Sequence, residues 1–400
     1  MKKLIPYLFP FILSLAGCEI DQREVLPEDG FTKIYNHPEE TLAFFAESVM
    51  ELDDGGFLFV SAVKDETSDI EYPYAYLVRT TAAGEVTWTQ SYDWLAPCSN
   101  LIRQGNSIGF VAMDPQFDAY FVEVDPITGA EVAQEDLQLT MPLHAFTNTS
   151  GNLLVLGYDF VSRSSVISRF GSSLTPERQA ELPINTDLQY DIQRHLNRTG
   201  QYYPFFIGEI EGAEGTGYFV NCFYNYTLRT VFLDRASLNP TGNIYSYQTE
   251  EGISAVIAKR ENSFGLTSYY EGNNYILLNV AIDVSASQNI KDFSAEPLYE
   301  LTYRAGVHPL VFETDSANYA LFVSQTNSSS MVIYQFDMDS DSLLMTHYKE
   351  FDQEVQIRDV LQSADKGLVV LCGIRILGKY RRPLLVKIPV DRFLPENFNN

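Results

Sequence analysis

Short apolar segments recur along this chain, and turn-forming residues separate each one from the next. The clearest copy reads GGFLFVSAV (55–63) and then YAYLVRTTAAGEVTWTQSY (74–92). Short runs that are rich in β-branched and aromatic residues and bounded by Gly, Asp or Pro are typical of β-strands. The unit therefore predicts a strand, a loop, a second strand, a turn at Gly84 and a third strand.

The same order of segments returns along the chain at a roughly constant interval. The first apolar residues of the seven inner runs are spaced by 51, 45, 65, 46, 55 and 49 residues. A period near 50 residues made of short strands is typical of β-propeller blades. We therefore predict an all-β fold, a β-propeller of seven four-stranded blades. The runs begin at Phe57, Ile108, Leu153, Tyr218, Phe264, Tyr319 and Leu368.

Six or eight blades remain alternatives because one interval is longer than the rest. The 65 residues between Leu153 and Tyr218 contain LQYDIQRHLNRTG (188–200). This stretch is either an inserted helix or part of an extra sheet.

The two ends of the ring are predicted to meet. The last unit lacks a fourth strand, and an unpaired edge strand is a liability in any sheet. FTKIYN (31–36) is an unassigned strand before the first unit, so we expect it to pair with residues 384–388 and close the ring. A single propeller domain would then span 31–394, with a tail at 395–400.

The first 18 residues, MKKLIPYLFPFILSLAGC, have the order of a bacterial lipoprotein signal. Lys2 and Lys3 precede an apolar stretch that is too short to span a bilayer, and Leu15-Ala16-Gly17-Cys18 follows as a lipobox. We predict a signal peptide at 1–17, lipidation of Cys18 with diacylglycerol and a fatty acyl chain such as palmitate, and a lipidated tether at 18–30. An ordinary secretory signal with an incidental cysteine is the alternative.

The repeat unit also resembles a known family. Asp54-Gly55-Gly56-Phe57, residues 76–80 and residues 84–88 are similar to the blade repeat of β-propeller lipoproteins from Bacteroidota, and 365–368 with 385–388 form a looser copy. The likeness covers about a quarter of the chain. It implies the fold, the lineage and an outer-membrane lipoprotein on the cell surface or the periplasmic face. The family has no single activity, so the resemblance implies no catalytic residue.

The charge of the chain restricts its partners. It carries 27 Lys and Arg against 53 Asp and Glu, a net charge of −26, and loss of Lys2 and Lys3 with the signal peptide gives −28. A field of this sign repels nucleic acid and anionic lipid headgroups. Membrane attachment should therefore come from the lipid on Cys18. The outer membrane, bound through this lipid, is thus the first predicted partner.

Neither cysteines nor histidines predict a cofactor, and no catalytic residue is predicted. Cys98, Cys222 and Cys372 lie far apart without C-x-x-C spacing, and the last two sit in apolar runs, so we interpret those two as core residues. The five histidines form no H-E-x-x-H pair. We therefore expect no enzyme activity.

Asp337, Asp339 and Asp341 form the one candidate metal site, because alternating aspartates can bind Ca²⁺. Ser342 and Tyr348 stand where a calcium loop would have Gly and Glu. Asp and Ser also favour turns without a metal, which is the simpler interpretation.

Two features favour a role in recognising a protein or a sugar. Ten tyrosines gather between residues 202 and 275, and Lys379-Tyr380-Arg381-Arg382 is the one basic cluster. We predict a non-catalytic binding or scaffold module of a cell-envelope complex with an envelope protein as partner. The alternative is a carbohydrate-binding or carbohydrate-active propeller, attached to a glycan uptake system.

Overall fold

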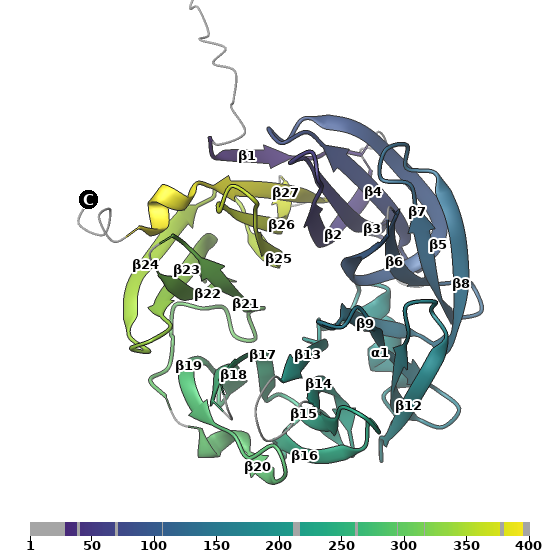
Figure 1. Cartoon of the computed structure of the whole chain (residues 1–400), viewed down its shortest axis with the longest axis vertical. Coiled ribbons are helices and arrows are strands. Elements are labelled where there is room, and N and C mark those ends of the chain that lie inside the picture. Colours follow the sequence, from purple (N-terminus) through teal and green to yellow (C-terminus); the bar gives the residue numbers. More distant parts are fainter. Residues whose placement is uncertain are drawn as a thin grey trace, which may run out of the picture.

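The strands form a ring of sheets around a central axis, which is a β-propeller (Figure 1). This arrangement is seen in a computed structural model that describes residues 29–37, 41–68, 71–105, 107–210, 217–260, 263–293, 295–315, 317–376 and 380–394. The predicted all-β propeller fold is confirmed.

The N-terminal part of the ring is one seven-stranded sheet whose order follows the chain. Its long central strand β5 pairs with β4 near Tyr92 and with β6 near Ile102. One strand thus joins two groups of strands in a single sheet. The members are β2 (Leu42–Glu51), β3 (Phe57–Asp65), β4 (Tyr74–Thr80), β5 (Val86–Gln104), β6 (Ser107–Met113), β7 (Asp118–Val124) and β8 (Glu131–Thr140).

The next sheets follow in chain order around the ring. The first has four strands, β9 (Pro142–Thr147), β10 (Leu153–Asp159), β11 (Ser164–Phe170) and β12 (Pro176–Pro183). The second combines β13 (Phe206–Ile210), β14 (Gly217–Tyr224), β15 (Thr227–Asp234) and β16 (Pro240–Tyr245) with β20 (Ser287–Asn289). The third consists of β17 (Gly252–Arg260), β18 (Ser263–Tyr270) and β19 (Asn273–Ala281).

Two four-stranded sheets complete the ring. One contains β21 (His308–Glu313), β22 (Asn318–Gln325), β23 (Ser330–Asp337) and β24 (Leu343–Glu350). The other contains β25 (Val355–Gln362), β26 (Leu368–Ile376), β27 (Tyr380–Ile388) and β1 (Phe31–Ile34). Short 3₁₀ turns occupy Ile290–Asp292 and Val390–Phe393.

The expectation of seven separate four-stranded sheets is met in part. Across the described ranges, six hydrogen-bonded sheets form, and three of them have four strands. The first departure arises because β5 continues from one group of strands into the next, with irregular pairing between Leu95 and Ile102. The second arises because β20 pairs in parallel with β16 of the preceding sheet rather than with β19.

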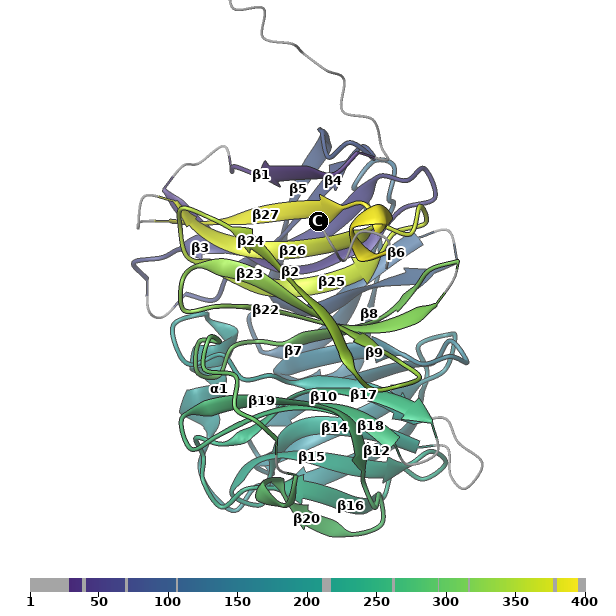
Figure 2. The ribbon, with the colours of Figure 1, turned by 90° about the vertical axis from the view of Figure 1, so that its left-hand side faces the viewer.

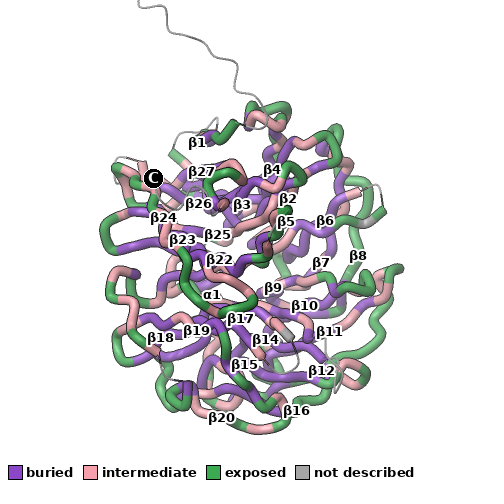
Figure 3. The backbone as a smooth tube through the Cα atoms, turned by 60° about the vertical axis from the view of Figure 1, so that its left-hand side comes forward, coloured by how far each residue is buried: buried purple, intermediate pink, exposed green. Residues whose placement is uncertain are grey.

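The apolar runs that the sequence marked as inner strands lie second from the axis. They are β3, β6, β10, β14, β18, β22 and β26, whereas β2, β9, β13, β17, β21 and β25 lie nearest the centre (Figure 1). The second strands are covered by neighbouring sheets on both faces, so nearly every residue in them is buried (Figure 3). A strand buried on both faces shows a continuous apolar run rather than alternation.

The ring closes as predicted. β1 pairs antiparallel with β27, with Phe31 opposite Lys387 and Ile34 opposite Leu384. Beyond the strand, the Tyr35 hydroxyl donates to the Gly84 carbonyl at 2.9 Å. The N-terminal strand therefore joins the last sheet to the first.

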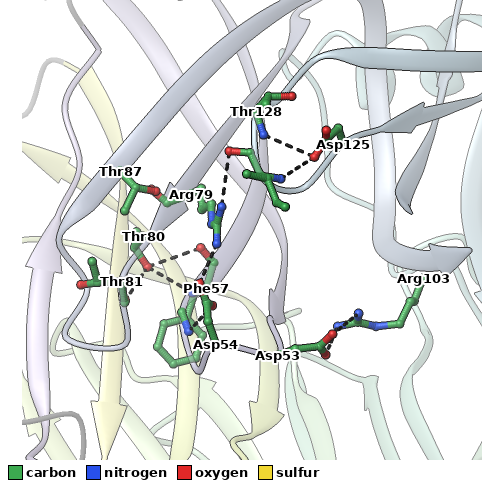
Figure 4. Close-up of polar contacts among 12 residues, drawn as sticks. Asp53, Asp54, Phe57, Arg79, Thr80, Thr81, Thr87, Arg103, Asp125 and Thr128 are labelled. Carbon is green, nitrogen blue, oxygen red and sulfur yellow. Dashed lines mark hydrogen bonds and ion pairs between the residues drawn. The ribbon is translucent and has the colours of Figure 1, made fainter. Parts of the chain in front are cut away.

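The repeated Asp-x-Gly turn has a structural cause, shown in Figure 4. The Asp54 carboxylate accepts hydrogen bonds from the Gly56 amide at 3.0 Å and from Arg79 Nη2 at 2.6 Å. A Cβ on Gly56 would lie 2.3 Å from the Thr80 carbonyl oxygen, so a side chain is excluded there. Asp365 accepts from the Gly367 amide in the same way at 3.2 Å. The motif is therefore a capped turn that packs against the next strand.

The long interval between Leu153 and Tyr218 contains a helix, α1 (Gln189–Leu196), and no extra sheet is formed by its described residues. Figure 2, a view along the plane of the ring, places α1 at one face. Residues 197–205 lead from the helix to β13, and we call them the axial segment.

Candidate functional site: an axial cavity

A cavity of about 370 Å³ lies where the strands nearest the axis converge. Its wall includes residues of β2, β5, β9, β13, β17, β21 and β25, together with the axial segment. This volume is in the range of small-molecule sites. The polar and aromatic lining residues include Glu47, Asn100, His144, His195, Arg198, Tyr202, Tyr203, His308, Arg358 and Asp359.

Buried charges hold the axial segment against the first sheet. Arg198 Nε contacts Glu47 Oε1 of β2 at 2.8 Å, and the two side chains are only 5% and 6% exposed. Arg198 Nη2 also donates to the Pro97 carbonyl at 3.2 Å, and Lys64 Nζ donates to the Asn197 carbonyl at 2.9 Å. The axial segment, which leads from α1 to β13 along the chain, is thus anchored on β2, β3 and β5.

Tyr202 joins the same segment to the last sheet. The Arg358 guanidinium of β25 lies 4.4 Å from the centre of the Tyr202 ring, a cation–π arrangement. The centre of the His195 ring lies 5.2 Å from that of Tyr202. Tyr202 remains 39% exposed. The pair therefore presents an aromatic face and a cation to the cavity.

The three histidines of the wall are neutral at pH 7. Burial lowers the pKa of His144 to about 3 and, with help from the Arg358 charge, lowers the pKa of His308 to about 4. Burial, followed by the Arg198 and Arg358 charges, also lowers the pKa of His195 well below its usual value. Each ring can therefore donate and accept a hydrogen bond without adding positive charge.

The two carboxylates of the wall are already bound by the protein. Glu47 is paired with Arg198, and Asp359 accepts from the amides of Val49 at 2.9 Å and Val360 at 2.8 Å. Burial raises the pKa of Asp359 to about 6, and these amide hydrogen bonds oppose the rise. The cavity therefore combines fixed polar groups with aromatic surface, which suits binding and orientation of a polar ligand.

The predicted lipidation residue, Cys18, lies outside the described residues. The same holds for the whole of 1–28, for Lys379 and for the tail at 395–400. Lipidation and the signal peptide therefore stay predictions. Within the described residues, no helix is both long and apolar enough to cross a bilayer.

Asp337 is the last residue of β23, and Asp339 and Asp341 lie in the turn that leads to β24. Asp337 Oδ1 accepts hydrogen bonds from the Asp339 amide at 3.0 Å and the Ser340 amide at 2.6 Å. Asp341 is paired with Lys259. In the part of the chain that the structure describes, no three His, Cys, Asp or Glu side chains are grouped to hold a metal ion. These contacts are those of a turn.

The described cysteines are free and buried, and Cys98 lines the cavity. Cys222 and Cys372 lie in the core, as predicted. The tyrosine-rich stretch divides into two groups: Tyr218 and Tyr269 are buried, whereas Tyr226 and Tyr247 are exposed. Packing thus accounts for only part of that enrichment.

Sequence reasoning missed the wall residues Glu47, Arg198, Arg358 and Asp359. They come from strands of different sheets and from the axial segment, so no local spacing connects them. The available signal was the long interval itself, which contains His195, Arg198 and Tyr202.

Comparison with known proteins adds little beyond the fold. No protein-family model matches the chain, and no curated protein matches it. Among solved structures, AofleA from Arthrobotrys oligospora aligns with a TM-score of 0.43 and 10% sequence identity, over 90% of each chain. An arginine-to-alanine mutant of AofleA aligns with a TM-score of 0.41, at the same identity and coverage.

Proposed function

We propose that this protein is a non-catalytic binding module that takes a polar ligand of sugar size in its axial cavity. The observation that carries the proposal is the convergence of two tyrosines, two carboxylates and two arginines on a cavity of about 370 Å³. Sugars are bound by aromatic faces together with fixed hydrogen-bonding groups. This convergence favours a carbohydrate ligand over a plain scaffold.

The absence of catalysis is part of the proposal. Glycoside hydrolysis requires one carboxylic acid and one carboxylate that are free to act on opposite sides of the bond. Glu47 is engaged by Arg198 and Asp359 by two main-chain amides. We propose that groups engaged in this way do not act as the acid and base of hydrolysis, so we expect the ligand to be held and released unchanged.

We also propose that the ring has seven blades. In this interpretation the seven-stranded sheet is two blades that share β5, and β17 to β19 form a blade without a regular fourth strand. The seven second strands, β3, β6, β10, β14, β18, β22 and β26, support this number.

The location and lineage rest on the sequence. We propose a Bacteroidota outer-membrane lipoprotein with Cys18 as its anchor, which presents the ring at the cell envelope. Replacement of Cys18 by Ala should move the protein from the membrane fraction to the soluble fraction and abolish labelling with a palmitate analogue. Membrane retention of Cys18→Ala without the label would disprove the anchor.

The binding proposal is tested on a glycan array with the full chain in detergent. We expect defined glycans to bind, and Tyr202→Ala to lose them because the aromatic wall is removed. Tyr247→Ala is the matched control, since Tyr247 is 80% exposed and is not part of the cavity wall. Equal binding by Tyr202→Ala and the wild type would disprove the axial site.

The scaffold alternative is tested by purification from detergent-solubilised envelopes. If an envelope protein co-purifies in stoichiometric amount and no glycan on the array binds, the protein is a scaffold and the carbohydrate proposal is wrong.

A further inference from the structure

Three arginines cluster on the last sheet beside the axial cavity. Arg358 belongs to β25, Arg375 to β26 and Arg381 to β27. Arg375 and Arg381 are directly opposite each other in the ladder. Arg358 Nη2 and Arg381 Nη1 donate to the same acceptor, Gln356 Oε1, at 3.0 and 2.9 Å. We call these three side chains the arginine cluster.

The cluster is short of negative partners. Arg375 Nη2 is paired with Glu66 Oε1 at 3.0 Å, while Gln356, the acceptor for the other two guanidinium groups, carries no charge. Like charges directly opposite each other in a sheet are destabilising. Burial, followed by the charges of Arg358 and Arg375, lowers the pKa of Arg381, and the charges of Glu354 and Glu66 oppose this shift.

Unused donors remain inside the cluster. Arg358 Nη1 and Arg375 Nε are buried, and neither has a hydrogen-bond partner among the described residues. Buried donors without an acceptor cost free energy, so a native protein normally provides one. Glu66 Oε2, in the carboxylate that is paired with Arg375, is itself a buried acceptor without a partner in the described part of the chain. The missing acceptor of Arg358 Nη1 is therefore the one expected to come from a ligand.

The cluster is continuous with the cavity through one residue. Arg358 both belongs to the cavity wall and stacks on Tyr202. A ligand against Tyr202 would thus have the Arg358 guanidinium at its edge, with Arg381 next to it through their shared acceptor, Gln356. The planar guanidinium fork matches a carboxylate in two parallel hydrogen bonds.

We propose that the arginine cluster recognises a carboxylate, and that the ligand is an acidic sugar of the uronic-acid class. This inference rests on the proposed carbohydrate function and specifies its ligand. The sugar ring lies against Tyr202, and its carboxylate accepts hydrogen bonds from Arg358 and Arg381.

The test compares D-glucuronate with D-glucose by calorimetry on the full chain in detergent. The two sugars share a ring and differ in the carboxylate. We expect D-glucuronate to bind at least tenfold more tightly than D-glucose. Arg381→Gln should remove that preference and leave the melting temperature unchanged or raised, because a repulsive charge is lost. Arg178→Gln is the control, since Arg178 is an exposed arginine on the outer strand β12.

Three results would overturn the inference. The first is equal affinity for the two sugars, which includes no measurable binding of either. The second is full retention of the preference for D-glucuronate in Arg381→Gln. The third is a clear drop in the melting temperature of that variant. The last would mean that the cluster stabilises the fold. If neutral glycans on the array depend on Tyr202 but not on Arg381, the proposed function stands and this inference fails. If D-glucuronate binding depends on Arg381 while the array shows no glycan, a carboxylate site stands without the carbohydrate function.

Discussion

The seam between β1 and β27 and the axial segment both join distant parts of the chain, but different interactions hold them. The seam is a regular antiparallel ladder supported by buried aromatic rings, among them Phe31 and Tyr35. The axial segment is held by a buried ion pair and by hydrogen bonds to main-chain carbonyls. The ring is thus closed by strand pairing, whereas its cavity is shaped by individual polar side chains. The first kind of contact leaves a pattern in the sequence, and the second does not.

The seam should be the costlier of the two to disrupt. Tyr35 is buried, its ring centre lies 4.9 Å from that of Phe59, and its hydroxyl donates to Gly84. Tyr35→Ala should lower the free energy of unfolding by about 3–5 kcal/mol, as expected for a truncated core aromatic residue. Urea denaturation measures this loss. Tyr35→Phe keeps the ring and should cost about 1 kcal/mol. Equal losses in the two variants would mean that the ring does not support the seam.

The axial segment should depend on charge pairing. Arg198→Met leaves the Glu47 carboxylate buried without its cation, which should cost about 3 kcal/mol in the same assay. The double variant Glu47→Leu/Arg198→Met should recover most of that loss, since no isolated charge remains. If the double variant is as unstable as Arg198→Met, packing rather than charge anchors the segment.

Acid should weaken the axial region in a way that the seam does not share. The pKa of His144 is about 3 and that of His308 about 4 in the folded protein, against about 6.5 in an unfolded chain. Below pH 6.5 the unfolded state therefore binds more protons, and each histidine lowers stability by about 1.4 kcal/mol per pH unit until its folded pKa is reached. Asp359 has the opposite sign: its folded pKa is about 6, so stability gained from its protonation is complete near pH 4 and lost as the pH rises through 6.

For His144, His308 and Asp359 together we expect a loss of about 2 kcal/mol between pH 6 and pH 4.5. His195 adds to this loss because burial also lowers its pKa, and urea denaturation across that range measures the sum. His308→Asn should make the decline shallower, and Asp359→Asn should make it steeper. Parallel pH profiles for the two variants would contradict the assignment of both groups.

The contrast explains how far the sequence alone could predict this protein. The propeller, the closing strand and the buried cysteines were predictable because doubly covered strands such as β3 and β26 are continuously apolar. The strands nearest the axis have a mixed pattern, as in β25, because one side packs against a sheet and the other faces a polar cavity. Those strands, which supply Glu47, Arg358 and Asp359, were therefore not recognised. The sharing of β5 between two groups of strands was not predicted, although Pro97 and Asn100 lie in the irregularly paired part of that strand.

The smallest effect is expected at the turn between β23 and β24, which belongs to neither region. The Asp337 carboxylate accepts two main-chain hydrogen bonds within its own turn, and Asp341 is engaged by Lys259. Asp337→Ala should therefore cost only about 0.5–1.5 kcal/mol, the usual contribution of hydrogen bonds at such a site. A ligand that binds only the folded state raises the melting temperature. Since we expect no calcium to bind at this turn, millimolar Ca²⁺ should leave the melting temperature of the wild type unchanged. A rise that disappears in Asp337→Ala would show a calcium site. The turn would then be a functional element of the ring.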